Sequence, residues 1–228
     1  GAATQGLANL IISNGEEAMK KGVAIAYDSR HFSDEFAKQA ACILAANGIN
    51  VKLYDELRPT PELSFAIRYY GTIAGINITA SHNPKEYNGY KVYWEDGAQL
   101  PPAEADVVAK EMGALDYFTD VKTMDFDKAL SEGLIKMMDW QTDEAYLKQV
   151  LAVSINRDCV KQVADEFKLI YTPFHGAGYR LVPEILKRLG YKHILCVKEQ
   201  MVIDGDFPTV KSPNPENKEG FNLSLIHI

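Results

Sequence analysis

The feature that most constrains this chain is an alternation of short apolar runs with longer amphipathic segments. The runs Val23 to Tyr27, Val51 to Tyr54 and Thr72 to Ile78 are short and mostly apolar, which is typical of buried strands. Between them, apolar residues recur at helical spacing in two longer segments. Such an alternation predicts strands that lie side by side in a sheet, helices packed on the sheet, and ligand-binding loops at the strand ends.

Helix boundary signals support this alternation. The segment from Ala2 to Lys21 has apolar residues at helical spacing, and we expect a helix that is broken near Asn14-Gly15. Ser33 is placed to cap the helix that follows the polar turn Asp28-Ser-Arg-His31, and Thr60-Pro61 is a cap-and-proline start for the next helix. The polar turn thus lies between a strand and a helix, where ligand-binding loops occur.

The pattern weakens and then restarts in the second half of the chain. Lys91 to Trp94 predicts a strand that closes back on the sheet, and Pro101 to Gly113 predicts a helix. Leu115 to Trp140 has little periodicity, and we expect the connection between two domains there or in the following helix, which Thr142 can cap. A second strand, helix, strand pattern extends from Lys168 to Val197 and stops unfinished.

The composition argues against several classes of function. The 228 residues carry 24 Lys and Arg against 31 Asp and Glu, a formal charge of −7, and no basic block, which disfavours nucleic acid or an anionic membrane as partner. No apolar run reaches the roughly 20 residues of a membrane helix, and no signal-peptide pattern opens the chain. Cys42, Cys159 and Cys196 lie far apart in apolar sequence, which predicts buried free thiols in a reducing compartment. We therefore expect a cytoplasmic protein.

The stretch from Ile78 to Lys91 carries the candidate chemistry, since it is a polar loop framed by apolar runs. Ser81 is a poor nucleophile unless a base removes its proton, and His82 cannot easily do so if the backbone is extended, because neighbouring side chains then point to opposite sides. The loop also lacks the G-x-S-x-G turn of serine hydrolases. A phosphorylated serine, in contrast, can pass its phosphoryl group to a nearby hydroxyl, and His82, Lys91 and Arg30 can supply the positive charge that this transfer requires.

Several motifs of the chain resemble one known family. Thr79-Ala-Ser-His-Asn-Pro84 followed by Tyr87-Asn-Gly-Tyr-Lys91 is similar to the phosphoserine loop of the α-D-phosphohexomutases, the family that contains phosphoglucomutase and phosphomannomutase. Further motifs resemble this family or its phosphoglucomutase and phosphopentomutase branch: Tyr27-Asp-Ser-Arg30, Pro59-Thr-Pro61, Tyr93-Trp-Glu-Asp-Gly-Ala-Gln99, Thr172-Pro-Phe-His-Gly-Ala-Gly178, Asp204-Gly-Asp-Phe-Pro208 and Pro213-Asn-Pro215. The resemblance extends from Ala2 to Asn222.

The resemblance implies a fold and a reaction. The fold is α/β, with a three-layer, mixed-sheet phosphohexomutase domain I at residues 1–140 and a partial domain II of the same type at residues 141–222. The implied isomerase interconverts glucose 1-phosphate and glucose 6-phosphate. Phospho-Ser81 donates its phosphate to the substrate, glucose 1,6-bisphosphate forms as intermediate and activator, and the other phosphate returns to the serine. Mg²⁺ is the implied cofactor, bound by the phosphate on Ser81 and by Asp ligands beyond the end of the chain.

The resemblance also implies roles for single residues. Ser81 is the phosphoryl carrier, and His82 and Lys91 are catalytic groups near the phosphate. Lys91 and Asn83 are expected to bind phosphate, although Asn83 can equally be a turn former. Arg30 either binds the phosphate or ties down its own turn by bonding to carbonyl groups and a neighbouring carboxylate.

Parts of the family pattern have no counterpart in the chain. These are an N-terminal Gly-Thr-x-Gly-x-Arg segment, the Asp-rich metal loop of domain II, and domains III and IV. We therefore expect an inactive fragment whose partners are a small-molecule phosphosugar and the missing domains. Residues 223–228, Leu-Ser-Leu-Ile-His-Ile, resemble the translation of CTGTCTCTTATACACATC, a transposase adaptor end used in sequencing, and are interpreted as an artefact. Two alternatives stay open: a phosphomannomutase or phosphopentomutase, and a non-catalytic module that binds a phosphosugar.

Overall fold

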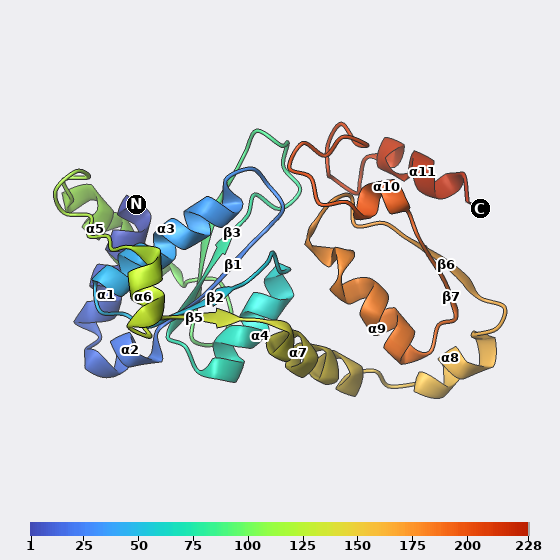
Figure 1. Cartoon of the computed structure of the whole chain (residues 1–228), viewed down its shortest axis with the longest axis horizontal. Coiled ribbons are helices and arrows are strands. Elements are labelled where there is room, and N and C mark those ends of the chain that lie inside the picture. Colours follow the sequence, from blue (N-terminus) through green and yellow to red (C-terminus); the bar gives the residue numbers. More distant parts are fainter. Residues whose placement is uncertain (228) are drawn as a thin grey trace. The chain divides into compact units, whose positions relative to one another are not determined.

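A computed structural model describes residues 1–227 of the chain (Figure 1). The helices are α1 (Ala2–Ser13), α2 (Glu16–Lys21), α3 (Ser33–Ala46), α4 (Thr60–Tyr70), α5 (Pro102–Ala114), α6 (Phe126–Ser131), α7 (Trp140–Ala152), α8 (Arg157–Val163), α9 (Leu181–Leu189), α10 (Lys198–Met201) and α11 (Asn222–Leu225). The strands are β1 (Val23–Tyr27), β2 (Val51–Tyr54), β3 (Ala74–Ile78), β4 (Tyr90–Trp94), β5 (Ile135–Met138), β6 (Lys168–Tyr171) and β7 (His193–Cys196).

Contacts between residues divide the chain into two compact units. The first unit holds Gly1–Tyr27, Phe32–Thr79 and Gly89–Asp139. The second unit holds Asp28–His31, Ala80–Asn88 and the residues from Trp140 onward. The turn after β1 and the serine loop after β3 therefore have most of their contacts in the second unit, although both follow strands of the first.

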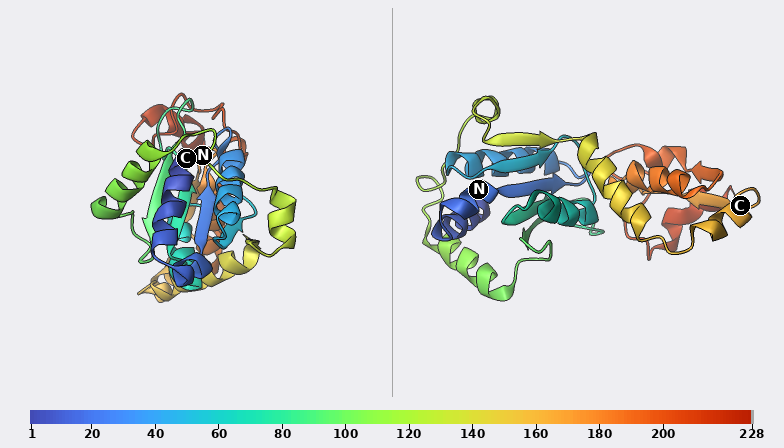
Figure 2. Two further views of the ribbon diagram at one scale, coloured as in Figure 1. Left: turned by 90° about the vertical axis from the view of Figure 1, so that its left-hand side faces the viewer. Right: turned by 90° about the horizontal axis from the view of Figure 1, so that it is seen from below.

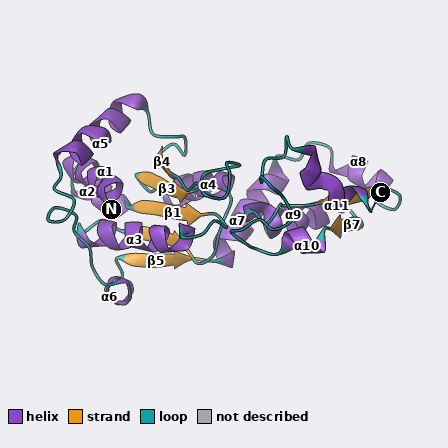
Figure 3. Ribbon diagram, turned by 90° about the horizontal axis from the view of Figure 1, so that it is seen from above, coloured by secondary structure: helices purple, strands orange, loops and turns teal. Residues whose placement is uncertain are grey.

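The first unit is built on a five-stranded sheet with the order β4-β3-β1-β2-β5. Figure 3 labels β4, β3, β1 and β5, which follow one another across the sheet in this order, with β2 between β1 and β5. β1 runs parallel to both β2 and β3, and β2 runs parallel to β5, whereas β4 is antiparallel to β3. The predicted α/β class with a mixed sheet is confirmed.

Alternating side chains of the strands pack on helices at both faces of this sheet. On one face, Ile25 and Ile76 belong to the main core, which includes buried residues of α1 and α3. On the other face, Ala26 and Tyr93 pack with Leu63 and other buried residues of α4. Figure 1 shows α3 and α4 on opposite sides of the strands, and α5 packs against α1 (Figure 2). The unit thus has three layers.

The weakly patterned region after α5 contains two elements that the sequence did not predict. They are α6, which Asp125 caps by accepting a hydrogen bond from the Lys128 backbone N–H, and the edge strand β5. The two middle residues of β5, Lys136 and Met137, are exposed, so burial of the strand is limited to its two ends and does not alternate. An edge strand with little burial has too short an apolar pattern to be recognised.

Three predicted caps are shifted. Thr60 is the first residue of α4, whose N-cap is Pro59 without a side-chain cap bond. Ser33 is the first residue of α3, whose N-cap is Phe32 in a left-handed conformation with φ of 65° and no side-chain cap bond. Thr142 lies inside the first turn of α7, because that helix begins at Trp140. A polar residue beside a helix start gives the position of the start only to within about two residues. The predicted break near Asn14-Gly15 is confirmed, since α1 and α2 meet there.

In the second unit, β6 and β7 form a parallel pair. Between them in sequence lies α9, which contacts β7 and packs on α7. This is the predicted strand, helix, strand pattern. No helix in residues 1–227 is long and apolar enough to cross a membrane.

The three cysteines are free thiols, as predicted, but they are not all buried. Cys42 is buried in α3, whereas Cys159 is exposed on α8 and Cys196 is partly exposed at the end of β7. The apolar neighbours of Cys159 in sequence belong to a short helix without any buried residue, which explains the wrong prediction.

Candidate active site

Two polar segments start at the same edge of the sheet. β1 and β3 are parallel neighbours, and their last residues, Tyr27 and Ile78, are register partners. The turn Asp28–His31 leaves the end of β1, and the loop Ala80–Asn88 follows β3. The carboxyl ends of adjacent parallel strands are the usual place for a binding site in an α/β sheet.

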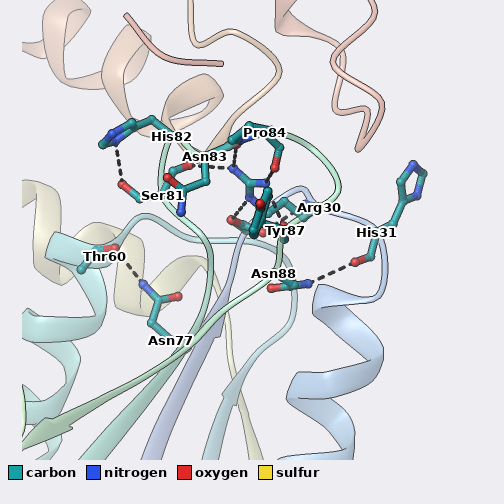
Figure 4. A network of polar contacts seen from close by, with 11 residues as sticks. Arg30, His31, Thr60, Asn77, Ser81, His82, Asn83, Pro84, Tyr87 and Asn88 are labelled. Carbon is teal, nitrogen blue, oxygen red and sulfur yellow. Dashed lines mark hydrogen bonds and ion pairs between the residues drawn. The ribbon is translucent and has the colours of Figure 1, made fainter. Parts of the chain in front are cut away.

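The side chain of Arg30 holds the serine loop through four main-chain carbonyl groups (Figure 4). Nη1 donates to Pro84 O at 2.8 Å and Tyr87 O at 2.9 Å, while Nη2 donates to Ser81 O at 3.1 Å and Asn83 O at 2.6 Å. These bonds join residues that lie 51 to 57 positions apart in sequence. The conformation of the loop is therefore determined by the turn after β1.

The geometry distinguishes between the two roles that the sequence left open for Arg30. Its side chain is only 1% exposed, and its Nε lies 3.2 Å from a carboxylate oxygen of Asp28. The buried Nε pairs with Asp28 but makes no hydrogen bond with any residue between 1 and 227. The other four of the five N–H donors of a guanidinium are used in the four hydrogen bonds to carbonyl groups. A direct bond to phosphate would require one of them to be broken, so Arg30 in this structure ties down the loop.

Ser81 and His82 lie together on the exposed part of the loop. Ser81 Oγ is 3.2 Å from His82 Nδ1, and both residues are exposed to solvent. The expectation that these neighbouring side chains point apart is wrong, because Ser81 has a φ of 60° and is not extended. His82 is therefore within hydrogen-bonding distance of the hydroxyl that would carry the phosphoryl group.

The two asparagines of the loop take part in its folding. The backbone N–H of Asn83 donates to Ala80 O at 3.1 Å, and its carbonyl is one of those that Arg30 holds. Asn88 Nδ2 donates to the His31 carbonyl at 3.1 Å, which joins the far end of the loop to the turn after β1. The side chain of Asn83 is exposed, and a contact between it and phosphate stays a prediction.

Lys91 belongs to the first unit, where it lies in β4 directly opposite Asn77 of β3. The structure thus brings Arg30, Ser81, His82 and Asn83 together in one unit and places Lys91 in the other. The contact of Lys91 with a phosphate on Ser81 stays a prediction.

A second support of the loop was not predicted from the sequence. Asp206 Oδ1 accepts a hydrogen bond from Lys85 Nζ at 3.1 Å and lies 3.3 Å from His31 Nε2. The hydrogen bonds from Lys85 and His31 hold the pKa of Asp206 below its usual value. The next residue, Phe207, lies under the Arg30 guanidinium, with 5.5 Å between Cζ and the ring centroid. In the sequence, this support was indicated only by the motif Asp204-Gly-Asp-Phe-Pro208. Nothing in the motif shows that Asp206 pairs with Lys85 and His31.

His175 is buried and organises a turn in the second unit. Its Nδ1 lies 2.7 Å from Val202 O and its Nε2 lies 2.8 Å from Thr209 Oγ1. Both ring nitrogens therefore have protein partners, and the residue is 1% exposed. This arrangement gives His175 a structural role.

Ser81 is the one residue of the chain that the resemblance assigns to magnesium, through its phosphate. Within residues 1–227, no three His, Cys, Asp or Glu side chains are grouped so that they can hold a metal ion. Mg²⁺ usually requires an octahedral set of oxygen ligands. The side chains of residues 1–227 do not form a magnesium site by themselves.

The comparison with protein families identifies the class of the chain. Residues 2–117 match "Phosphoglucomutase/phosphomannomutase, alpha/beta/alpha domain I", and residues 144–227 match domain II of the same family. The chain belongs to the phosphoglucomutase/phosphomannomutase family. The second match includes residues 223–227, for which a sequencing artefact stays a hypothesis.

Two individual relatives show which members of the family the chain is similar to. A phosphoglucomutase of Staphylococcus saprophyticus is 38% identical over 218 residues, which are 96% of this chain and 38% of that protein. A probable phosphoribomutase of Schizosaccharomyces pombe is 35% identical over 231 residues, covering 97% of this chain and 38% of the relative. The chain thus spans less than two-fifths of the length of these relatives.

Solved structures share the fold. A putative phosphomannomutase from Thermus thermophilus superposes with a TM-score of 0.78 at 23% identity, over 99% of this chain and 46% of that structure. Parafusin, a phosphoglucomutase from Paramecium, gives a TM-score of 0.70 at 22% identity, over 91% of this chain and 40% of that structure.

Proposed function

We propose that the protein containing this chain is an α-phosphoglucomutase that interconverts glucose 1-phosphate and glucose 6-phosphate through phospho-Ser81. The observation that supports this most is the exposed Ser81 hydroxyl on a loop fixed by Arg30, with His82 Nδ1 at 3.2 Å. A carrier must present its phosphate to a small sugar in a constant position, because the rate of a group transfer depends steeply on orientation.

The proposed transfer conserves the phosphoryl group. The bond between phosphorus and Ser81 Oγ breaks as a bond forms to the unphosphorylated 1- or 6-hydroxyl of the sugar, and a protein base takes the hydroxyl proton. The sugar is then glucose 1,6-bisphosphate. The bisphosphate then reverses its orientation in the site, and its other phosphate is transferred back to Ser81 Oγ. His82 and Lys91 are the proposed proton-transfer and charge-stabilising groups, and Mg²⁺ is the proposed cofactor that neutralises phosphate charge.

The test is an activity assay of the complete gene product that contains this chain. With glucose 1-phosphate, Mg²⁺ and a trace of glucose 1,6-bisphosphate, we expect glucose 6-phosphate to form. Ser81→Ala should abolish this turnover, and Ser81 in the active protein should carry phosphate when it is examined by mass spectrometry. Unimpaired turnover by Ser81→Ala would remove the serine from the mechanism.

A pentose substrate is the second candidate, and the similarity to a probable phosphoribomutase supports it. The same assay with ribose 1-phosphate and mannose 1-phosphate separates the sugars by their kcat/KM values. An α-phosphoglucomutase should favour glucose 1-phosphate. Binding of these phosphosugars without turnover of any of them would favour a non-catalytic phosphosugar-binding module.

A further inference from the structure

Asn77 and Lys91 form a polar pair on the side of the sheet that packs on α4. They are register partners on the antiparallel strands β3 and β4. Two positions further along β4, Tyr93 packs among residues of α4, so the alternation of side chains places Lys91 on that face as well. Directly opposite residues have Cβ atoms about 5 Å apart, which brings an asparagine amide within reach of a lysine ammonium.

The amide of Asn77 is buried and only half satisfied. The residue is 1% exposed, and its Nδ2 donates to Thr60 Oγ1 at 2.7 Å (Figure 4). Its Oδ1 accepts no hydrogen bond from any residue between 1 and 227. A buried acceptor without a donor costs about 1–3 kcal/mol, so a buried amide oxygen of this kind calls for an explanation.

Thr60 sets the orientation of this amide. It lies between Pro59 and Pro61 at the start of α4, where the two proline rings restrict the backbone. Its hydroxyl also hydrogen bonds to Tyr93, whose pKa is raised by burial and lowered in part by the bonds to Gln99 and Thr60. Thr60 Oγ1 accepts from Asn77 Nδ2, which leaves Asn77 Oδ1 for another donor.

Lys91 is the possible donor that lies directly opposite Asn77 in the sheet. Its side chain is partly buried and makes no ion pair or hydrogen bond within the described part of the chain. We propose that Asn77 is a positioning residue, whose free Oδ1 takes a hydrogen bond from Lys91 Nζ when the complete protein binds its phosphosugar and so holds the ammonium for phosphoryl transfer. This proposal rests on the proposed function, and it gives the Pro59-Thr60-Pro61 turn a part in orienting a catalytic group.

Two nearly isosteric variants of the complete protein test the proposal. Asn77→Leu removes the acceptor oxygen and should lower kcat about 10- to 100-fold, with KM changed less than about threefold, because a misplaced group impairs the transfer more than the binding. Asn77→Asp keeps an acceptor oxygen toward Lys91, while the Thr60 hydroxyl can donate to the other oxygen. It should retain kcat within about threefold.

Two further variants separate positioning from a structural effect. In a Lys91→Met background, Asn77→Leu should cause no additional loss of kcat, because the group that it positions is absent. The matched control is Thr72→Val, just before β3, since Thr72 is also 1% exposed and its Oγ1 has no hydrogen bond to any of residues 1–227. Thr72→Val should leave kcat unchanged.

The outcomes are distinct from those that test the proposed function. Equal losses in Asn77→Leu and Asn77→Asp, or a full further loss in the Lys91→Met background, would overturn the positioning role while Ser81→Ala still abolished turnover. Full turnover by Ser81→Ala would instead overturn the proposed function.

Discussion

Arg30 shows why a particular amino acid occupies a buried position beside the candidate site. Four carbonyl oxygens converge on its two terminal nitrogens, at distances between 2.6 and 3.1 Å. A planar guanidinium can serve four such acceptors and an ion pair to Asp28 at once, whereas a lysine ammonium has three donors and no fixed plane. The loop that carries Ser81 thus depends on the shape of this side chain as well as on its charge.

Arg30→Lys should therefore impair the complete protein although it keeps the charge. We expect kcat to fall by about tenfold or more, because the Ser81 loop loses its fixed position. We expect the free energy of unfolding to fall by about 2–4 kcal/mol, because buried carbonyl groups lose their donors. Phosphomutase kinetics and urea unfolding measure the two effects.

Arg188→Lys is the matched control for Arg30→Lys. Arg188 binds Glu144 and Glu184 on the surface of the second unit, and surface ion pairs contribute little to stability. Its replacement should change the free energy of unfolding by less than about 1 kcal/mol and leave kcat unchanged. If the two variants behaved alike, Arg30 would not be the residue that fixes the loop.

At the scale of single residues, the sequence predicted which side chains lie together but not their conformations. Ser81, His82 and Arg30 were selected from their motif, and the structure brings them together. The left-handed conformations of Ser81 and Phe32 were not predictable, because non-glycine residues adopt positive φ only when the surrounding structure compensates the strain. The distance between Ser81 and His82 depends on that conformation, so the expectation from an extended backbone was wrong.

The close packing of α4 on β3 depends on a glycine, Gly75, in the strand. A Cβ atom on Gly75 would lie 2.4 Å from Ile67 Cδ1 and 2.8 Å from Ile67 Cγ1. Both residues are in the layer that also contains Thr60 and Asn77, so the distance between helix and strand there is set by glycine. An added methyl group in a packed core displaces its neighbours.

Gly75→Ala should destabilise the protein by about 1–3 kcal/mol, because Ile67 must move. Combining it with Ile67→Val, which removes the nearest methyl group, should recover part of that loss. Thermal or urea unfolding measures both variants.

Gly113→Ala is the control for the glycine variants. Gly113 lies in α5 and a Cβ atom there would meet nothing within 4 Å, so alanine should be neutral or stabilising by up to about 1 kcal/mol through its helix propensity. An equal loss of stability in Gly75→Ala and Gly113→Ala would show that contact with Ile67 does not limit the packing.

At the scale of elements, the sequence predicted β1, β2, β3 and the helices between them because each buries a complete apolar face. It failed at β5, where the buried positions are Ile135 and Met138 at the two ends of a four-residue strand. It also misplaced the start of α3, whose N-cap is a phenylalanine. Patterns identify elements that supply the core, whereas edge strands and unusual caps are determined by tertiary contacts.

At the scale of the whole molecule, two matches assign the chain to two α/β domains of one protein family, and the relatives are more than twice as long. The proposed reaction needs a base, a sugar-binding surface and oxygen ligands for Mg²⁺ in addition to the carrier loop. Only part of this set is present in the described residues.

Residues 1–228 expressed alone should therefore show no mutase turnover. Without groups that orient the sugar beside Ser81, phosphoryl transfer from this residue is not accelerated. The assay is the conversion of glucose 1-phosphate described above, with the complete gene product as positive control and circular dichroism to establish that the shorter protein is folded. Measurable turnover by the folded shorter protein would contradict the proposal that it is inactive.

The bonds made by Arg30 also constrain the order of events during folding. They join positions 51 to 57 residues apart, so the loop cannot reach its final conformation until β1 and β3 have paired. Contacts of such long sequence separation form late, because the chain between them must first be ordered. If Ser81 carries phosphate as proposed, it becomes a competent acceptor only in a chain that has already assembled its central strands, and its first phosphorylation then reports completed folding of that region.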